Sequence, residues 1–291
     1  MGSGYLTYHG VKKDYSIFKA RVDGSLTEVT AEMLDGATKI SNSAFNDCDS
    51  LTSVTIPSSV TSIGNNAFSN CDGLTSISIP NSVTSIGEST FSNCSALTSI
   101  DISSSVTEIR YGVFSRCKAL TSITIPSSVT SIDGYVFSWC TALTSVTIPS
   151  SVTSIGSSVF NGCTSLASVA LPNSITSIGM DFFRGCTSLT SVTIPNSVTS
   201  IGSSAFNGCS ALTSIDIPSS VTSIGMDLVR GCTLLTSIIV EATTPPTLGT
   251  NVFQGTHADL VIYVPAGSVE TYKSANRWSA YASRIQTMPS T

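Results

Sequence analysis

The stretch that decides the fold is LTSVTIPSSVTSIGNNAFSNCDG, residues 51–73, because most of the chain consists of close copies of it. The cysteines give the period: Cys48 and Cys71 are 23 residues apart, and so is every later neighbouring pair up to Cys232. A phenylalanine stands three residues before each cysteine, except at Val229, and a leucine stands three residues after it. A fixed period of this length indicates a solenoid, in which each repeat forms one coil and stacks on the next.

Each repeat predicts two short extended stretches and one compact turn. Residues 51–56 carry apolar side chains among polar ones, as a half-buried strand does, and Pro57 cannot donate a ladder hydrogen bond, so pairing should stop there. A second extended stretch ends at Gly64, where we expect a backbone conformation with positive φ. Residues 65–70 are too few for a helix of average length and predict one or two helical turns.

A single coil exposes about as much apolar surface as it buries, so it needs neighbours in order to fold. Coils stacked at about 4.8 Å would pair strand with strand. The expected fold is an α/β repeat solenoid with 23 residues per coil, a parallel β-sheet on one face, and short strands and helical turns on the other.

The repeat bounds also predict three regions. Residues 1–39 are expected to form an N-terminal cap, made of a β-hairpin and a degenerate repeat. Residues 40–240 form the solenoid. Residues 241–291 form a C-terminal cap, in which Ser268 caps a short helix and Trp278 helps to cover the last coil.

The repeat L-x-x-[VI]-x-I-P-x-x-V-x-x-I-G-x-x-x-F-x-x-C resembles the BspA-like leucine-rich repeats of bacterial and some protist surface proteins. The resemblance covers about residues 40–240, and its departures are local: Ser103 replaces the proline, and Arg110 and Asp133 replace the glycine. It implies a leucine-rich-repeat protein, extracellular or at the cell surface, that binds a protein or extracellular-matrix ligand in adhesion. It implies no catalytic residues.

Composition narrows the partners. With 13 Lys and Arg against 18 Asp and Glu, the formal net charge is −5, and no basic patch is available for nucleic acid. No apolar run reaches the roughly 18 residues that a membrane-spanning helix needs. Met1 to Gly4 lack the apolar core of a signal peptide, so we expect an export signal to have been removed. The protein is expected to be monomeric and to need no cofactor.

Nine cysteines invite a metal or disulfide interpretation, but their spacing opposes both. Zinc sites use closely spaced pairs such as C-x-x-C, and the sequence has none. Parallel side chains on stacked coils keep Cβ atoms about 4.8 Å apart, beyond the roughly 3.5–4.5 Å that a disulfide needs. We therefore predict buried free thiols and no metal site.

The same absence of partners argues against catalysis. The two histidines, His9 and His257, lie outside the repeats, so no serine of the repeats is expected to find a base within hydrogen-bond reach. We predict that the protein is not an enzyme and has no catalytic residues.

The candidate binding site is a group of aromatic and basic residues in two consecutive repeats. It consists of Arg110, Tyr111, Arg116, Tyr135 and Trp139, and we call it the aromatic–arginine patch. Tyr, Trp and Arg are the residue types that most often dominate binding energy at protein interfaces. We expect the five side chains to lie side by side on the turn-rich face of the solenoid.

Two alternatives to a binding scaffold stay open. Near-identical repeats are compatible with a self-assembling structural fibre, which the distinct ends of the chain oppose. Rows of Ser and Thr on the strand face are compatible with ice or crystal binding, although Asp101, Ala170 and Asp216 interrupt them. A non-catalytic extracellular binding scaffold is the preferred interpretation.

Overall fold

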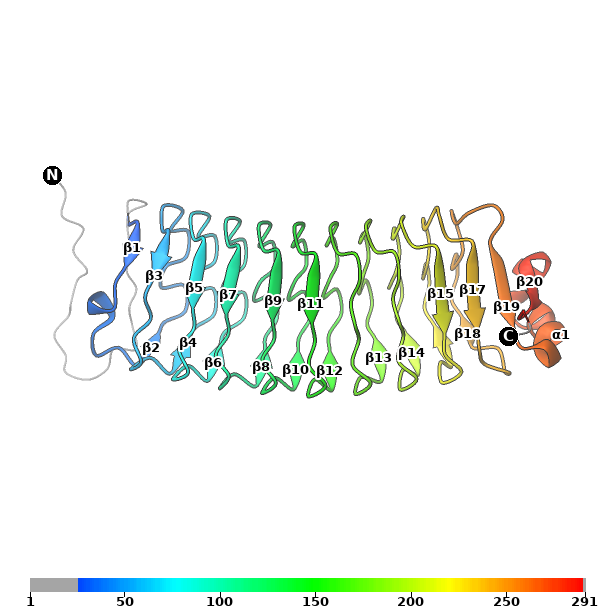
Figure 1. Ribbon diagram of the computed structural model, residues 1–291, viewed down its shortest axis with the longest axis horizontal. Coiled ribbons are helices and arrows are strands. Elements are labelled where there is room, and N and C mark those ends of the chain that lie inside the picture. Colours follow the sequence, from blue (N-terminus) through cyan, green and yellow to red (C-terminus); the bar gives the residue numbers. More distant parts are fainter. Residues whose placement is uncertain (1–25, 290–291) are drawn as a thin grey trace. The chain divides into compact units, whose positions relative to one another are not determined.

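A computed structural model describes residues 26–289 of the chain. The chain divides into two compact units between Ser151 and Val152, which we call unit 1 and unit 2. In each unit, successive coils carry two rows of short strands (Figure 1). The hairpin expected near the N-terminus falls before residue 26, outside the described part.

Unit 1 begins with a 3-10 helix, η1 (Glu32–Leu34), between its first two strands. Its first strand row consists of β1 (Glu28–Val29), β3 (Ser53–Val54), β5 (Ser76–Ser78), β7 (Ser99–Asp101), β9 (Ser122–Thr124) and β11 (Ser145–Thr147). Its second row consists of β2 (Lys39–Ile40), β4 (Ser62–Ile63), β6 (Ser85–Ile86), β8 (Glu108–Ile109) and β10 (Ser131–Ile132). The paired strands are parallel and one repeat apart, as Ser62 opposite Ser85 illustrates.

Unit 2 continues both rows. Its second row consists of β12 (Ser154–Ile155), β13 (Ser177–Ile178), β14 (Ser200–Ile201), β16 (Ser223–Ile224) and β18 (Thr247–Leu248). Its first row consists of β15 (Ser214–Ile217), β17 (Ser237–Val240), β19 (Val261–Val264) and β20 (Ile285–Thr287). Near its end lie η2 (Ala266–Ser268), α1 (Val269–Ser274) and η3 (Trp278–Arg284).

The predicted solenoid of 23-residue coils is confirmed, but its turns contain little helix. Over residues 65–70 the backbone forms tight turns, and many of its N–H groups donate to the following coil: Asn66 to Glu88 O at 2.9 Å and Phe68 to Thr90 O at 2.9 Å. An amide that bonds to a neighbouring coil is not available for a helical hydrogen bond. In residues 26–289 the helices therefore stand only near the two ends of the chain.

The expectation of a positive φ at Gly64 was wrong. Positive φ occurs further along the turn, at Asn66 (54°) and Asn70 (60°). Gly64 is needed for another reason, because a Cβ there would lie 2.5 Å from the backbone nitrogen of Asn42 in the preceding coil. The close approach of two coils, and not a left-handed backbone, excludes a side chain at this corner.

The core consists of ladders of identical side chains, of which phenylalanine and cysteine form two. In unit 1 the rings from Phe45 to Phe137 stack with centroids 5.2–5.9 Å apart. The Cys71 thiol donates to the carbonyl oxygen of Phe45 at 3.1 Å, and the later coils of each unit repeat this contact. All nine cysteines are free and buried, as predicted. Burial raises the pKa of the Cys94 thiol to about 12.

At the end of unit 2, Trp278 is buried and donates its Nε1–H to Pro246 O at 2.8 Å. The ring of Tyr281 meets Phe253 edge-on, with centroids 4.8 Å apart. The expected capping role of Ser268 was wrong, because its side chain makes no capping hydrogen bond to α1. Ser268 instead ends η2 and is itself buried.

Candidate binding surface

The aromatic–arginine patch lies within unit 1 and exposes three large aromatic side chains. Tyr111 is 47 % exposed, Tyr135 36 % and Trp139 50 %. The rings of Tyr111 and Tyr135 have centroids 5.2 Å apart with planes tilted by 45°. The predicted proximity of these two tyrosines is therefore present, and their rings form a small apolar surface open to solvent.

Three members of the patch adopt a backbone conformation that large side chains rarely take. The φ angles of Arg116, Tyr135 and Trp139 are 62°, 61° and 62°. For a residue other than glycine, asparagine or aspartate, this region costs roughly 1–2 kcal/mol. Other coils of unit 1 place Asn or Asp at the position of Arg116 and Trp139, as at Asn93, whose φ is 62°. The patch therefore uses costly residues where cheaper ones fit the fold.

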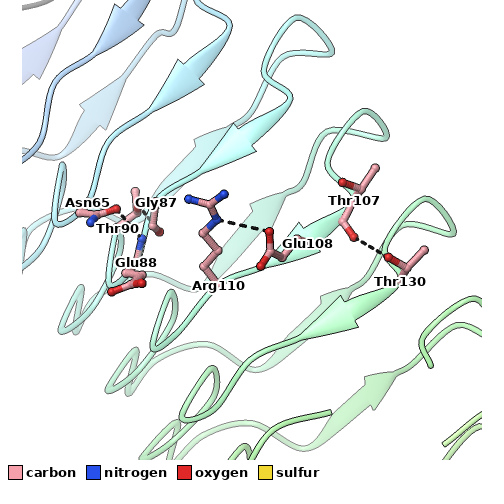
Figure 2. Close-up of polar contacts among 8 residues, drawn as sticks. All are labelled: Asn65, Gly87, Glu88, Thr90, Thr107, Glu108, Arg110 and Thr130. Atoms are coloured by element: carbon pink, nitrogen blue, oxygen red, sulfur yellow. Dashed lines mark hydrogen bonds and ion pairs between the residues drawn. The ribbon is translucent and has the colours of Figure 1, made fainter. Parts of the chain in front are cut away.

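The two arginines of the patch lie differently. Arg116 is exposed, and its backbone N–H donates to Ser138 O at 2.7 Å, which places it beside Trp139 in the next coil. Arg110 extends along the preceding coil, with its Nε 3.4 Å from Glu108 Oε2 (Figure 2). Arg110 also lines a shallow groove of about 510 Å³ over the second strand row, together with Lys39 and Ser62 among others.

Acidic groups surround the Arg110 guanidinium. The pKa of the Asp133 carboxyl is raised, first by partial burial and then by the negative charges of Glu108 and Glu88. Three carboxylates around one guanidinium already supply its counter-charge, so Arg110 is poorly placed to attract an anionic ligand. The exposed aromatic rings and Arg116 are the members of the patch best placed to contact a partner.

Unit 2 carries a second exposed surface that the sequence analysis missed. The segment GMDFFRGC at 179–186 recurs as GMDLVRGC at 225–232, whereas the coils before and between them read GSSVFNGC at 156–163 and GSSAFNGC at 202–209. The signal is thus an alternation over two coils. We call the surface the Met–Arg face, and it consists of Met180, Asp181, Arg184, Met226, Asp227 and Arg230.

Both halves of the Met–Arg face have the same geometry. Met180 and Met226 are each 50 % exposed. Arg184 Nη1 lies 3.5 Å from the Asp181 carboxylate, and the Arg230 pair is separated by 3.7 Å. The arginine side chains are 56 % and 51 % exposed, whereas the aspartates are 17 % and 24 % exposed. Each half therefore presents a thioether and a cation to solvent.

Two absences apply to residues 26–289. No cluster of three or more His, Cys, Asp or Glu side chains has the geometry of a metal site. No helix in this part of the chain combines the length and apolar character needed to cross a membrane.

Comparison with known proteins follows the repeat. The family model described as "BspA type Leucine rich repeat region (6 copies)" matches residues 23–144 and again residues 130–259. No curated protein matches the chain at a significant level.

Solved structures also match. A leucine-rich repeat protein from T. pallidum is 36 % identical, with a TM-score of 0.53 over 55 % of this chain and 77 % of that protein. A leucine-rich cell surface protein from Faecalibacterium prausnitzii is 35 % identical, with a TM-score of 0.54 over 73 % of this chain. The chain spans 59 % of the length of the F. prausnitzii protein. The family match over most of the chain confirms the resemblance: the chain belongs to the BspA-type leucine-rich repeat family.

Proposed function

We propose that this protein is a non-catalytic adhesion protein, extracellular or attached to a cell surface, that binds a protein or extracellular-matrix ligand through the aromatic–arginine patch. Leucine-rich repeats of this family are typically non-catalytic binding scaffolds. A relative in the family is described as a cell surface protein, which supports the proposed location.

One observation carries the choice of site: Arg116, Tyr135 and Trp139 are large, exposed side chains on left-handed backbone. Strained backbone of this kind persists where the surrounding fold holds it, and it concentrates at functional sites. Since Asn fits the same positions in other coils, stability does not explain these three residues. Exposed Trp, Tyr and Arg are suited to dominate the binding energy of an interface.

The test replaces each patch residue with the asparagine that another coil uses at the same position. The quadruple variant Tyr111→Asn, Arg116→Asn, Tyr135→Asn, Trp139→Asn follows Asn65, Asn66 and Asn70. Arg110 is kept because Glu108 already pairs with it. The variant should fold at least as stably as the parent protein, because Asn tolerates positive φ.

Binding is measured with labelled protein on immobilised basement-membrane extract and on fixed epithelial and bacterial cells. The quadruple variant should bind at least about tenfold more weakly than the parent protein to whichever surface retains it. The matched control is Leu234→Ala, which removes another exposed apolar side chain (53 % exposed) at a position where other coils have Ala. Equal binding by the quadruple variant would refute the site, and no retention on any surface would count against adhesion.

A further inference from the structure

The Met–Arg face repeats at a defined distance. Asp181 N–H donates to Ser203 O at 2.9 Å, and Ser204 N–H donates to Met226 O at 2.7 Å, so the three coils stack in direct succession. Coils paired through parallel strands are about 4.8 Å apart, which places Met180 and Met226 about 9.6 Å apart. Arg184 and Arg230 are separated by the same two steps.

This distance matches one turn of a polyproline II helix. That conformation has three residues per turn and a rise of about 3.1 Å per residue, so residues i and i+3 lie on the same side about 9.3 Å apart. An extended β-type strand fits less well, because its side chains alternate and residues i and i+3 point to opposite sides. A polyproline II segment along the face would offer equivalent side chains to Met180 and Met226.

The chemistry of the face selects the residues of such a segment. The flexible thioethers of Met180 and Met226 suit the irregular apolar surface of a proline ring. The guanidinium groups of Arg184 and Arg230 are more exposed than the aspartates that fix them. The charge that faces a ligand is therefore positive at both halves and calls for a carboxylate at the same three-residue interval.

We propose that the Met–Arg face binds an acidic, proline-containing segment of a partner protein in polyproline II conformation. In this complex every third residue is a proline in contact with Met180 or Met226, and the next residue is a glutamate that pairs with Arg184 or Arg230. A polyproline II ligand loses little conformational entropy on binding, because it is preformed in solution. The assignment involves unit 2 alone and does not depend on the aromatic–arginine patch.

The probes are fluorescently labelled peptides of twelve residues, and binding is followed by fluorescence anisotropy at low ionic strength. The first peptide contains four Pro-Glu-Ser repeats and has the required period. The second contains three Pro-Glu-Ser-Ser repeats, in which the period is four residues or about 12.4 Å. The third contains four Pro-Gln-Ser repeats and has no charge. We expect the first peptide to bind about tenfold more tightly than either of the others.

Variants of the full chain test the spacing directly. Met226→Ser should weaken binding of the first peptide about tenfold. The double variant Ser203→Met, Met226→Ser keeps the number of exposed methionines but moves them to adjacent coils, about 4.8 Å apart. It should bind as weakly as Met226→Ser, since the second methionine no longer meets the next turn of the ligand. Thiol protection in each variant verifies that the coils remain folded.

The charge is tested by Arg184→Gln, Arg230→Gln, with two control substitutions of similar charge change, Lys273→Gln in α1 and Arg284→Gln in η3, introduced together. The arginine variant should bind the glutamate peptide no more tightly than the glutamine peptide, whereas the control should retain the difference. The proposal is overturned if the three peptides bind the parent protein equally, if none binds at millimolar concentration, or if the moved methionine restores affinity.

Discussion

The same corner of the coil is built differently in the two units. In unit 1 this corner is occupied by Asp47, Asn70, Asn93, Arg116 and Trp139, with φ between 60° and 63°. In unit 2 it is occupied by Gly162, Gly185, Gly208, Gly231 and Gly255, with φ between 70° and 74°. The backbone requirement is therefore shared, but only unit 2 meets it throughout with the residue that carries no steric cost.

The difference separates two uses of one position. The Asn70 side-chain amide donates to Asp47 Oδ1 at 2.7 Å, and the Asn93 amide donates to Asn70 Oδ1 at 3.1 Å. These hydrogen bonds between coils offset the cost of a side chain at positive φ. Arg116 and Trp139 follow in the same column, and their exposed side chains lie on the surface to which we assign binding. Conformational economy in unit 2 and binding in unit 1 are thus alternative uses of one corner.

The largest predicted effect concerns what the units share. Burial raises the pKa of Cys94 and Cys140 in unit 1, and of Cys186 in unit 2, to about 12. At pH 8 roughly one such thiol in ten thousand is ionised, against about a quarter of ordinary thiols. Alkylation of the native protein should therefore be at least about a thousandfold slower than in 6 M guanidinium chloride.

Mass spectrometry after a timed iodoacetamide pulse assigns the label to each cysteine. Similar protection in both units would confirm that they differ at the surface and not in the core. Rapid labelling of the native cysteines in only one unit would contradict the common core.

The next effect distinguishes two kinds of glycine in unit 2. A Cβ at Gly225 would lie 2.3 Å from the Ser203 backbone nitrogen, whereas a Cβ at Gly208 would meet nothing closer than 3.7 Å. Gly225→Ala should therefore lower the free energy of unfolding by about 3 kcal/mol, through steric overlap. Gly208→Ala should lower it by only about 1 kcal/mol, through its positive φ.

Urea unfolding followed by circular dichroism measures both losses. Gly267→Ala is the control, because nothing lies within 4 Å of a Cβ there. If Gly225→Ala proved as mild as Gly267→Ala, the close approach of the coils would not be the reason for glycine at this corner.

A smaller effect tests the left-handed backbone in unit 1. Trp139→Gly should be more stable than Trp139→Ala by about 1 kcal/mol, because Ala keeps the cost of positive φ. At Tyr111, whose φ is not positive, the order should reverse, and Ala should be more stable by about 0.5–1 kcal/mol. Each pair removes the same aromatic ring, so lost packing largely cancels in the difference. Unfolding midpoints in urea give both differences, and the same order at both positions would argue against strain at Trp139.

The smallest effect concerns charge. The pKa of Asp133 is raised in the folded protein, so the folded state binds its proton more tightly than the unfolded chain does. Its contribution to stability is full below the unfolded pKa and is lost as pH rises through the folded pKa. Asp133→Asn should therefore raise Tm at pH 7 by no more than about 1–2 °C, since the group is partly exposed, and the gain should vanish near pH 3.5. Thermal scans at the two pH values check this, and a gain that grows in acid would contradict the sign.

Sequence periodicity predicted the coil, the strand rows and the buried thiols, because core positions recur at every repeat. It did not predict the state of residues 65–70, since hydrogen bonds to the next coil are not visible within one repeat. Glycine at position 64 was assigned to positive φ, although close approach of backbones demands the same residue. Similar ambiguity arises wherever two physical causes select one amino acid.

The candidate surface was predictable where it depends on adjacency. Tyr111 and Tyr135 fall in consecutive repeats, so their contact follows from the period. The direction of Arg110 was not predictable, because it depends on Glu108 and on the open space beside Gly87 in the preceding coil (Figure 2). Met180 and Met226 were missed because a consensus over single coils averages out a pattern that repeats every second coil.

That alternation in unit 2 has a consequence for how the gene can change length. Each coil of a solenoid contacts only its neighbours, so recombination between repeats can remove coils without dismantling the core. Loss of one coil, 23 residues, brings unlike neighbours together and disturbs the rhythm of the surface. Loss of 46 residues, twice 23, leaves the rhythm in phase. In this part of the chain the heritable module is a pair of coils.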